Sequence, residues 1–174
     1  MTYFTKLKTT VPLSESEIKD SLTAYGDGRI EFFKISSNVE QQMLSIIPEK
    51  YQQYFTGSTM KIKGPYIPPH TDSYRKVGIN FYIKTDNATT KFFEKRSENI
   101  ATTQVKGQAE GYVFNELDLI LKDTFVANDN EIWILDITKI HAVSNPRGTE
   151  RIAYSLSSNV ASYEQTVKML KDLI

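Results

Sequence analysis

The chain has 174 residues, of which 40% are apolar and 24% are charged, the composition of an ordinary globular domain with room for a core. Its formal net charge is zero, which disfavours a nucleic-acid partner, and it has no cysteine, which excludes disulfides and thiolate metal sites. No apolar run approaches the roughly 18 residues of a membrane span, and residues 1–8 lack the apolar core of a signal peptide. We therefore expect a cytoplasmic protein without a membrane partner.

The first 50 residues predict elements that brace a sheet from outside. Residues 2–8 alternate in a way that allows a strand, and residues 29–35 predict another. Capping boxes at residues 14–17 and 37–40 each indicate the start of a helix. The apolar residues at helical spacing define the expected buried faces: Ile18, Leu22 and Tyr25 in the first helix, and Val39, Met43 and Ile46 or Ile47 in the second.

The middle of the chain predicts short strands separated by turns. In residues 51–63 a turn at Gly57-Ser58 precedes a strand, and residues 89–95 are expected to pair back as a hairpin on residues 77–83. Residues 64–69 are rich in proline and short of amide donors, so they either fix the approach of the next residues or form only a rigid loop. In residues 77–83 the alternation puts Gly78, Asn80 and Tyr82 on one face and Val77, Ile79, Phe81 and Ile83 on the other.

The C-terminal part continues this pattern of short strands. Residues 98–108 are polar and predict a loop, roughly where a lid or substrate loop would lie, and residues 111–125 predict one or two strands. A turn at 127–130, strands at 131–136 and 151–157, and a helix that begins at Ser162 complete the chain. Many short strands in one domain indicate a mainly β fold with flanking helices, either a sandwich or a jelly roll. The expected core spans residues 55–158, and the closing helix spans 162–174 with Val167, Leu170 and Leu173 or Ile174 inward.

The two histidines of the sequence, together with one aspartate, suggest a metal site. His70 and Asp72 are two residues apart, so on a strand both side chains point to the same side. His141 follows another strand-like segment. Two imidazoles and one carboxylate hold iron(II) on one face and leave its other positions open for O2. Taken singly, each residue also fits a structural role, as a polar loop histidine, a turn aspartate or a histidine at a strand edge.

Arg151 opens the last predicted strand, ten residues after His141. Its planar guanidinium matches a carboxylate in a bidentate way, so we interpret it as the anchor of an acidic cosubstrate. A pairing with Glu150 or Asp136 at the surface is the structural alternative. Arg147 is a rival anchor, although Gly148 makes a strand at that position less favourable, and it is also a candidate for contact with substrate.

These motifs resemble the iron(II)- and 2-oxoglutarate-dependent oxygenases, whose pattern is His-x-Asp, a long gap, a second His, and Arg or Lys about ten residues later. The segment from Lys63 to Asp72 is similar to the entry of the prolyl 4-hydroxylase-like members. The segments 78–83 and 89–93 resemble the two strands that follow there, and His141 to Asn145 with Arg151 to Leu156 resembles the distal half. The resemblance covers roughly residues 55 to 158.

The resemblance implies a double-stranded β-helix, which is a cupin-like jelly roll, and a dioxygenase that hydroxylates a C–H bond with release of succinate and CO2. Its cofactors are then Fe(II) at His70, Asp72 and His141, the cosubstrate 2-oxoglutarate at Arg151, and O2, with ascorbate in support. The family often has a serine two residues after the arginine, whereas this chain has Ala153. A second contact is therefore expected from Tyr66, Asn80 or Tyr82.

The resemblance favours a peptidyl, prolyl-type substrate, followed by a small molecule. Two alternatives from other classes stay open. One is a non-catalytic cupin-like β-barrel that binds a metal or ligand. The other is an interaction domain in which the three candidate ligands lie far apart.

Overall fold

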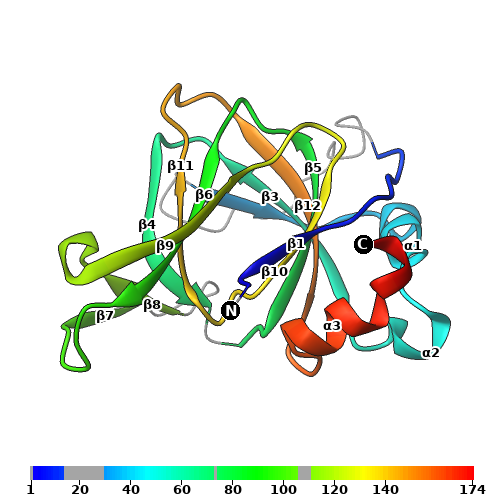
Figure 1. The fold of residues 1–174 in the computed structure, drawn as a ribbon. Coiled ribbons are helices and arrows are strands. Elements are labelled where there is room, and N and C mark those ends of the chain that lie inside the picture. Colours follow the sequence, from blue (N-terminus) through cyan, green and yellow to red (C-terminus); the bar gives the residue numbers. More distant parts are fainter. Residues whose placement is uncertain (1, 14–29, 73, 106–110) are drawn as a thin grey trace.

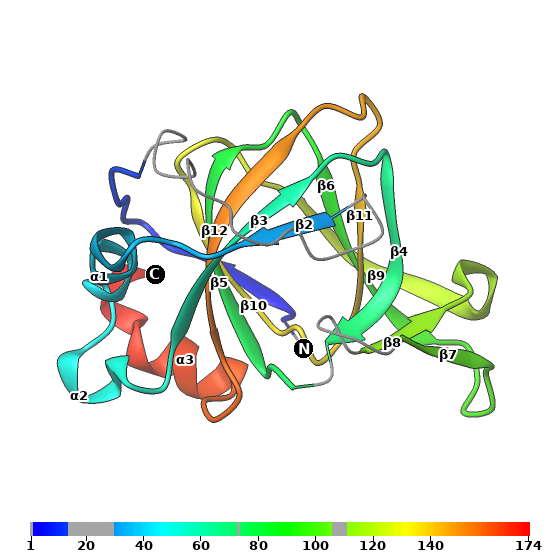
Figure 2. The same ribbon diagram turned by 180° about the vertical axis from the view of Figure 1, so that it is seen from behind.

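The computed structural model describes residues 2–13, 30–72, 74–105 and 111–174, and it consists mainly of two six-stranded antiparallel sheets that face each other (Figures 1 and 2). The helix expected from the capping box at 14–17 lies outside the described residues. The first sheet has the order β1-β10-β5-β12-β3-β2, and the second has the order β7-β8-β4-β11-β6-β9. The strands are β1 (Phe4–Lys6), β2 (Ile30–Phe33), β3 (Thr56–Ile62), β4 (Tyr66–Asp72), β5 (Val77–Lys84), β6 (Thr89–Lys95), β7 (Thr102–Val105), β8 (Gly111–Phe114), β9 (Leu119–Val126), β10 (Ile132–Leu135), β11 (Ile140–Ser144) and β12 (Arg151–Ser158).

Eight of these strands form a jelly roll, as the many short strands predicted. The chain crosses from one sheet to the other along β3, β4, β5 and β6, and again along β9, β10, β11 and β12. In the middle of the sheets, β12 lies between β3 and β5, while β11 lies between β4 and β6. Strands β1 and β2 extend the ends of the first sheet, and the β7–β8 pair extends the second sheet beyond β4. The mainly β, cupin-like fold class is therefore confirmed.

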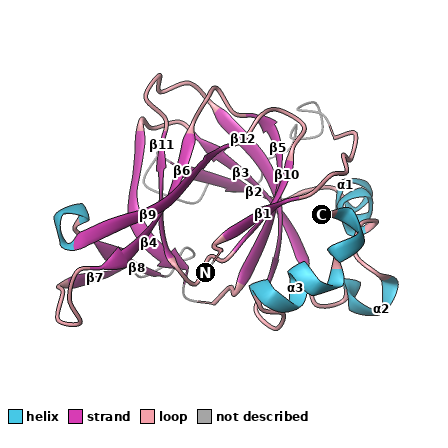
Figure 3. Ribbon diagram, in the orientation of Figure 1, coloured by secondary structure: helices cyan, strands magenta, loops and turns pink. Residues whose placement is uncertain are grey.

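The helices α1 (Ser37–Leu44), α2 (Glu49–Gln52) and α3 (Tyr163–Met169) gather at one end of the molecule (Figure 3). Helix α3 begins after Ser162, as predicted, with a capping box between Ser162 and Gln165, and a 3-10 turn at Lys171–Leu173 follows it. Helix α1 is capped by Ser36, whose side chain accepts the amide of Val39, so the predicted capping box of Ser37 and Glu40 is wrong. The Glu40 carboxylate accepts the amide of Gly57. In the described part of the chain no helix has the length and apolarity required to cross a membrane.

The alternation in β5 separates the two faces of the first sheet, as the sequence predicts. One face carries the main core, in which α1 and α3 pack against apolar residues of β5, β10 and β12. The other face looks toward the second sheet and carries Gly78, Asn80 and Tyr82. The cluster against the helices includes Val39, Met43, Val77, Ile79, Phe81, Ile132, Ile134, Tyr154, Leu156, Tyr163 and Leu170, with Ile83, Val167, Leu173 and Ile174 packed beside it.

Three expectations about strand pairing, turns and loops are wrong, and one strand was missed. Residues 89–95 form β6 but do not pair with β5, because β6 lies in the other sheet between β11 and β9. Gly57-Ser58 lies inside β3 and forms no turn, and a Cβ at Gly57 would lie 2.3 Å from Ile35 Cδ1, so glycine serves close packing there. The polar segment 98–108 contains β7, and β11 is a strand that the sequence pattern did not identify.

Candidate metal and cosubstrate site

A bulge in β4 turns the two N-terminal ligand candidates into the space between the sheets. Opposite β11, His70 pairs with His141 and Ile67 pairs with Val143. Three steps along β4 thus match two steps along β11, so Pro68 and Pro69 contain one extra residue. Because a strand alternates its faces at every residue, a regular strand with Ile67 inward would point His70 outward. Proline has no amide to lose from the ladder, which suits it to this place.

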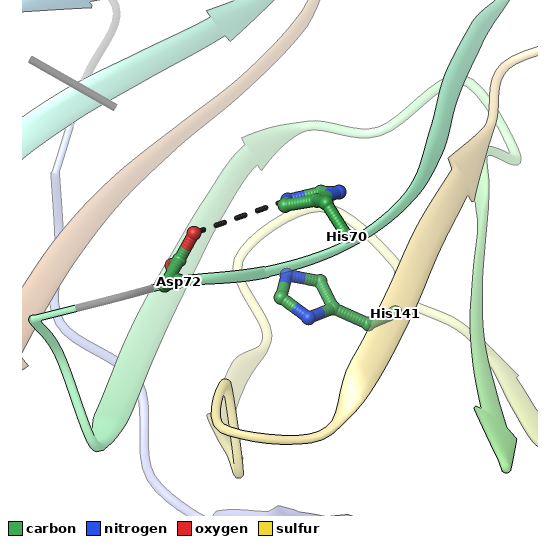
Figure 4. A group of neighbouring side chains, drawn as sticks. All are labelled: His70, Asp72 and His141. Atoms are coloured by element: carbon green, nitrogen blue, oxygen red, sulfur yellow. Dashed lines mark ion pairs between the residues drawn. The ribbon is translucent and has the colours of Figure 1, made fainter. Parts of the chain in front are cut away.

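His70, Asp72 and His141 come together at this bulge. Their nearest ligand atoms all lie within 4.8 Å of one another, and His70 Nε2 is 3.9 Å from Asp72 Oδ1. Figure 4 shows the two imidazoles on the neighbouring strands β4 and β11, with the Asp72 carboxylate directed toward His70; the ring centroids are 4.3 Å apart. The alternative in which the three residues lie far apart is therefore wrong.

Backbone carbonyls orient both imidazoles for binding through Nε2. The Nδ1–H of His70 donates to the carbonyl of Pro68 at 2.8 Å, and the Nδ1–H of His141 donates to that of Lys139 at 2.9 Å. A carbonyl only accepts, so Nδ1 carries the proton and Nε2 keeps its lone pair for a cation. Burial and the neighbouring His70 lower the pKa of His141 to about 4, so its ring is neutral at neutral pH.

Arg75 holds the carboxylate of the cluster from its other side. Its Nη2 is 2.9 Å from Asp72 Oδ2, while Asp72 Oδ1 faces the imidazole of His70. The two carboxylate oxygens therefore have different partners, and Oδ1 is the one available to an ion. Arg75 does not stand out in the sequence, because an arginine three residues after an aspartate is a common surface pairing.

Arg151 is a buried cation without a carboxylate partner in the described part of the chain. Its side chain is 2% exposed, and Nη2 donates to Thr90 Oγ1 at 3.0 Å. Its Nε and Nη1 are buried and make no hydrogen bond, and the guanidinium lies 4.9 Å from the ring centroid of Tyr82. The surface pairing with Glu150 or Asp136 is wrong: Glu150 pairs with Lys61, and Asp136 lies near Lys139. A buried and unpaired charge is costly, so this arrangement suits an anionic ligand.

The cluster and Arg151 line the same cavity, which has a volume of about 80 Å³. Of the predicted second contacts, Asn80 and Tyr82 line this cavity, and the Asn80 amide donates to the Tyr82 hydroxyl at 3.3 Å. The further cavity residues are Ile30, Phe32, Met60, Ile62, Ile67, Arg75, Gly78, Thr90, Leu135, Ile137, Val143 and Ser155.

Tyr66 does not reach the cavity, which corrects its predicted role. It precedes the bulge, packs against the apolar cluster on the outer side of the second sheet, and donates its hydroxyl to Glu116. The rival anchor Arg147 is exposed and pairs with Asp86 at 3.1 Å. Thr90, which contacts Arg151 directly, was missed, because nothing in the sequence shows that β6 passes beside the start of β12.

The residues present fit a metal ion and an acidic cosubstrate. Two neutral imidazoles and a carboxylate are a donor set for iron(II). Ligand atoms bonded at about 2.1 Å to one ion lie at most about 4.2 Å apart. A small inward movement of these side chains therefore brings all three ligand atoms within bonding distance of one ion. The two orphaned donors of Arg151 match the two oxygens of a carboxylate.

A scan against protein-family models and a search of curated proteins gave no match. Among solved structures, the vicilin of Corylus avellana matches with a TM-score of 0.45 and 8% identity over 81% of this chain. The vicilin of Solanum melongena matches with 0.42 and 10% over 78%, and that of Capsicum annuum with 0.46 and 10% over 82%. The matched regions cover 31%, 29% and 31% of those vicilin chains, so this chain spans about a third of their length. The site's chemistry is therefore inferred from this chain's own residues.

Proposed function

We propose that the protein is an iron(II)- and 2-oxoglutarate-dependent dioxygenase that hydroxylates a C–H bond. One observation carries the proposal: a buried guanidinium with two unpaired donors lies in the same cavity as a cluster of two histidines and one aspartate. The cluster alone suits any metal-binding barrel. Arg151 adds the requirement for a carboxylate ligand deep in the cavity, which a dicarboxylate cosubstrate meets.

The cluster would hold the ion through Nε2 of both histidines and through Oδ1 of Asp72. The carbonyls behind each Nδ1 fix the rings before metal arrives, so little ordering remains on binding. The low pKa of His141 means that the ion does not compete with a proton on this ring at neutral pH.

Arg151 and Thr90 would hold the distal carboxylate of 2-oxoglutarate. Thr90 Oγ1 already accepts a hydrogen bond from Nη2 of Arg151, a residue that lines the cavity. The guanidinium lies over the ring of Tyr82, which adds a cation–π contact. With 2-oxoglutarate and O2, the iron supplies oxidation of a C–H bond with succinate and CO2 as coproducts.

Buried apolar residues around the site would exclude water during that oxidation. Five buried apolar residues line the cavity: Ile62, Ile67, Leu135, Ile137 and Val143. A dry cavity strengthens the contact between Arg151 and a carboxylate, because charges interact more strongly at low dielectric.

The test is the stoichiometry of 2-oxoglutarate consumption. The protein is incubated with Fe(II), ascorbate, O2 and 2-oxoglutarate, and succinate and O2 uptake are measured together, in wild type, His141→Ala and Arg151→Gln. We expect equal amounts of succinate formed and O2 consumed in wild type, and a loss of at least about 100-fold in both variants. Metal and 2-oxoglutarate binding without succinate, across a broad substrate panel, would favour the non-catalytic binding barrel instead.

A further inference from the structure

The residues that line the cavity differ in their exposure. Tyr82, Thr90 and Arg151 are buried, with 1%, 3% and 2% exposed. Six others are half-buried, and we call these six the open end: Ile30, Phe32, Met60, His70, Asp72 and Arg75. Two of the candidate metal ligands, His70 and Asp72, thus belong to the part of the cavity that solvent reaches, whereas the candidate cosubstrate anchor is buried.

One wall of the open end is apolar and comes from β2, a strand outside the eight of the jelly roll. Antiparallel pairing puts Ile30 of β2 opposite Ile62 of β3, and Phe32 opposite Met60. All four side chains line the cavity. Strand β2 therefore lengthens the first sheet by an apolar surface beside the metal cluster, and the eight core strands do not need it for closure.

Arg75 stands where this wall meets the metal cluster. Its guanidinium carbon is 6.0 Å from the ring centroid of Phe32, and its Nη2 contacts Asp72 Oδ2. The side chain is 31% exposed, which leaves it open to a ligand. A guanidinium has five N–H donors, so one contact with Asp72 uses only part of them.

The charges around the cavity do not balance without a further anion. Among the described cavity residues Asp72 is the one acid, whereas Arg75 and Arg151 are both cations. When iron(II) and the doubly charged 2-oxoglutarate are bound, the positive charges of the ion and the two guanidiniums exceed the negative charges of Asp72 and the cosubstrate by one. An uncompensated charge beside an apolar wall favours a ligand that carries one negative charge.

We infer that the substrate is a small amphipathic carboxylic acid, with its carboxylate on Arg75 and its apolar part on the wall of Ile30, Phe32 and Met60. This inference rests on the proposed function, because it names the substrate of the same site. It departs from a neutral prolyl peptide, which would offer Arg75 no negative charge beyond its contact with Asp72.

The test compares acids with their neutral amides as binding probes. Hexanoate and hexanamide are titrated into nitrogen-15-labelled protein, loaded with Zn(II) as a redox-inert ion and with 2-oxoglutarate, and chemical shifts report affinity. We expect hexanoate to bind at least about tenfold more tightly than hexanamide, because a hydrogen bond to a charged group is worth about one decade or more. Affinity should rise about fourfold for each methylene from butanoate to hexanoate.

Three variants test whether Arg75 causes the tighter binding of hexanoate than of hexanamide. Arg75→Gln should reduce this preference below about threefold, because the charge is lost, and Arg75→Lys should retain part of it. Arg147→Gln, which removes an exposed cation outside the cavity, should leave it unchanged. A purely structural effect of Arg75 on the site would weaken the acid and the amide equally.

Other outcomes overturn the inference. They are equal binding of acid and amide, a preference that survives Arg75→Gln, a preference lost only in Arg151→Gln, or tighter binding of a neutral prolyl peptide. Zn(II) and 2-oxoglutarate binding are measured first by calorimetry, and their absence counts against the proposed function. The same probe series is also titrated into metal-free protein. Binding of the acid at Arg75 is thereby tested separately from binding of metal and 2-oxoglutarate.

Discussion

His70 and His141 face each other directly across β4 and β11, while the next paired residues, Ile67 and Val143, are three and two steps away along their strands. The extra residue lies in Pro68-Pro69, and it brings both His70 and Ile67 to the inner face. The clustering of His70, Asp72 and His141 therefore depends on a register shift and not only on the presence of these residues in the sequence.

Deletion of Pro68 and Pro69 together should remove the candidate metal site while the jelly roll persists. His70 then follows Ile67 directly, so His70 and Asp72 turn to the outer face of β4, because successive residues alternate. Calorimetric titration with Zn(II) should show no binding, and circular dichroism should still show the β fold. Deletion of Pro69 alone leaves His70 two residues after Ile67, on the same face of a regular strand, and should bind Zn(II) nearly as wild type does. Tight binding by the double deletion, or none by the single deletion, would contradict this account of the bulge.

Arg151→Met should weaken cosubstrate binding and raise the stability of the folded protein. It replaces an unpaired buried cation by an apolar side chain of similar length, and such replacements are often stabilising by about 1 kcal/mol or more. In metal-free protein we expect Tm to rise by about 2–4 °C, while affinity for 2-oxoglutarate falls at least about 100-fold and Zn(II) affinity is retained. Arg147→Met at the surface is the control. A marked fall in Tm for Arg151→Met would show that the guanidinium has a structural role.

Gly111 is needed where β8 meets the end of β4. A Cβ at this residue would lie 2.0 Å from the carbonyl oxygen of Thr71, and Gly111 pairs with Asp72 in the β4–β8 register. Gly111→Ala should push β8 away from the ligand strand, cost about 1–3 kcal/mol of unfolding free energy, and weaken Zn(II) binding. Gly78→Ala, whose Cβ would meet Ile137 at an ordinary 3.6 Å, should cost less. Urea unfolding of both variants measures the difference.

Glu131 should make folding stability sensitive to acid. Burial raises its pKa, but hydrogen bonds from Asn128, Lys6 and Trp133 outweigh burial and lower the pKa to about 2. The unfolded chain then binds a proton at higher pH than the folded one, so this stabilisation is full above about pH 4.5 and is lost as pH falls toward 2. Glu131→Gln should flatten the dependence of the urea midpoint on pH in this window. Glu98→Gln, at an exposed position, should leave the dependence of the urea midpoint on pH as it is in wild type.

Much of the fold was predictable, because alternation and capping are local signals. The two faces of β5, the start of α3 at Ser162 and the strand that begins at Arg151 follow from residue spacing alone. Which strands pair is not local: β6 has the length of a hairpin partner for β5 but joins the other sheet. The pattern missed β11 because four of its five residues are buried in succession, so apolar and polar residues do not alternate along it.

The clustering of the candidate ligands was predictable from the sequence, and the surroundings of the candidate site were less so. His70, Asp72, His141 and Arg151 stand out because their residue types and order suit one chemistry. Thr90 and Arg75 act through tertiary contacts that carry no signature in the sequence. Tyr66 was placed in the pocket because the bulge after it was not foreseen, and that bulge puts it on the opposite face from His70.

The most direct test of the central claim is an anaerobic titration of the protein with Fe(II) and then with 2-oxoglutarate, followed by visible absorption. The account predicts a weak metal-to-ligand charge-transfer band in wild type that saturates at one equivalent of iron. The band should be absent in His141→Ala and should require much more 2-oxoglutarate in Arg151→Ala. No band in folded, iron-loaded wild-type protein would contradict the oxygenase proposal and leave a metal-binding barrel as the better description.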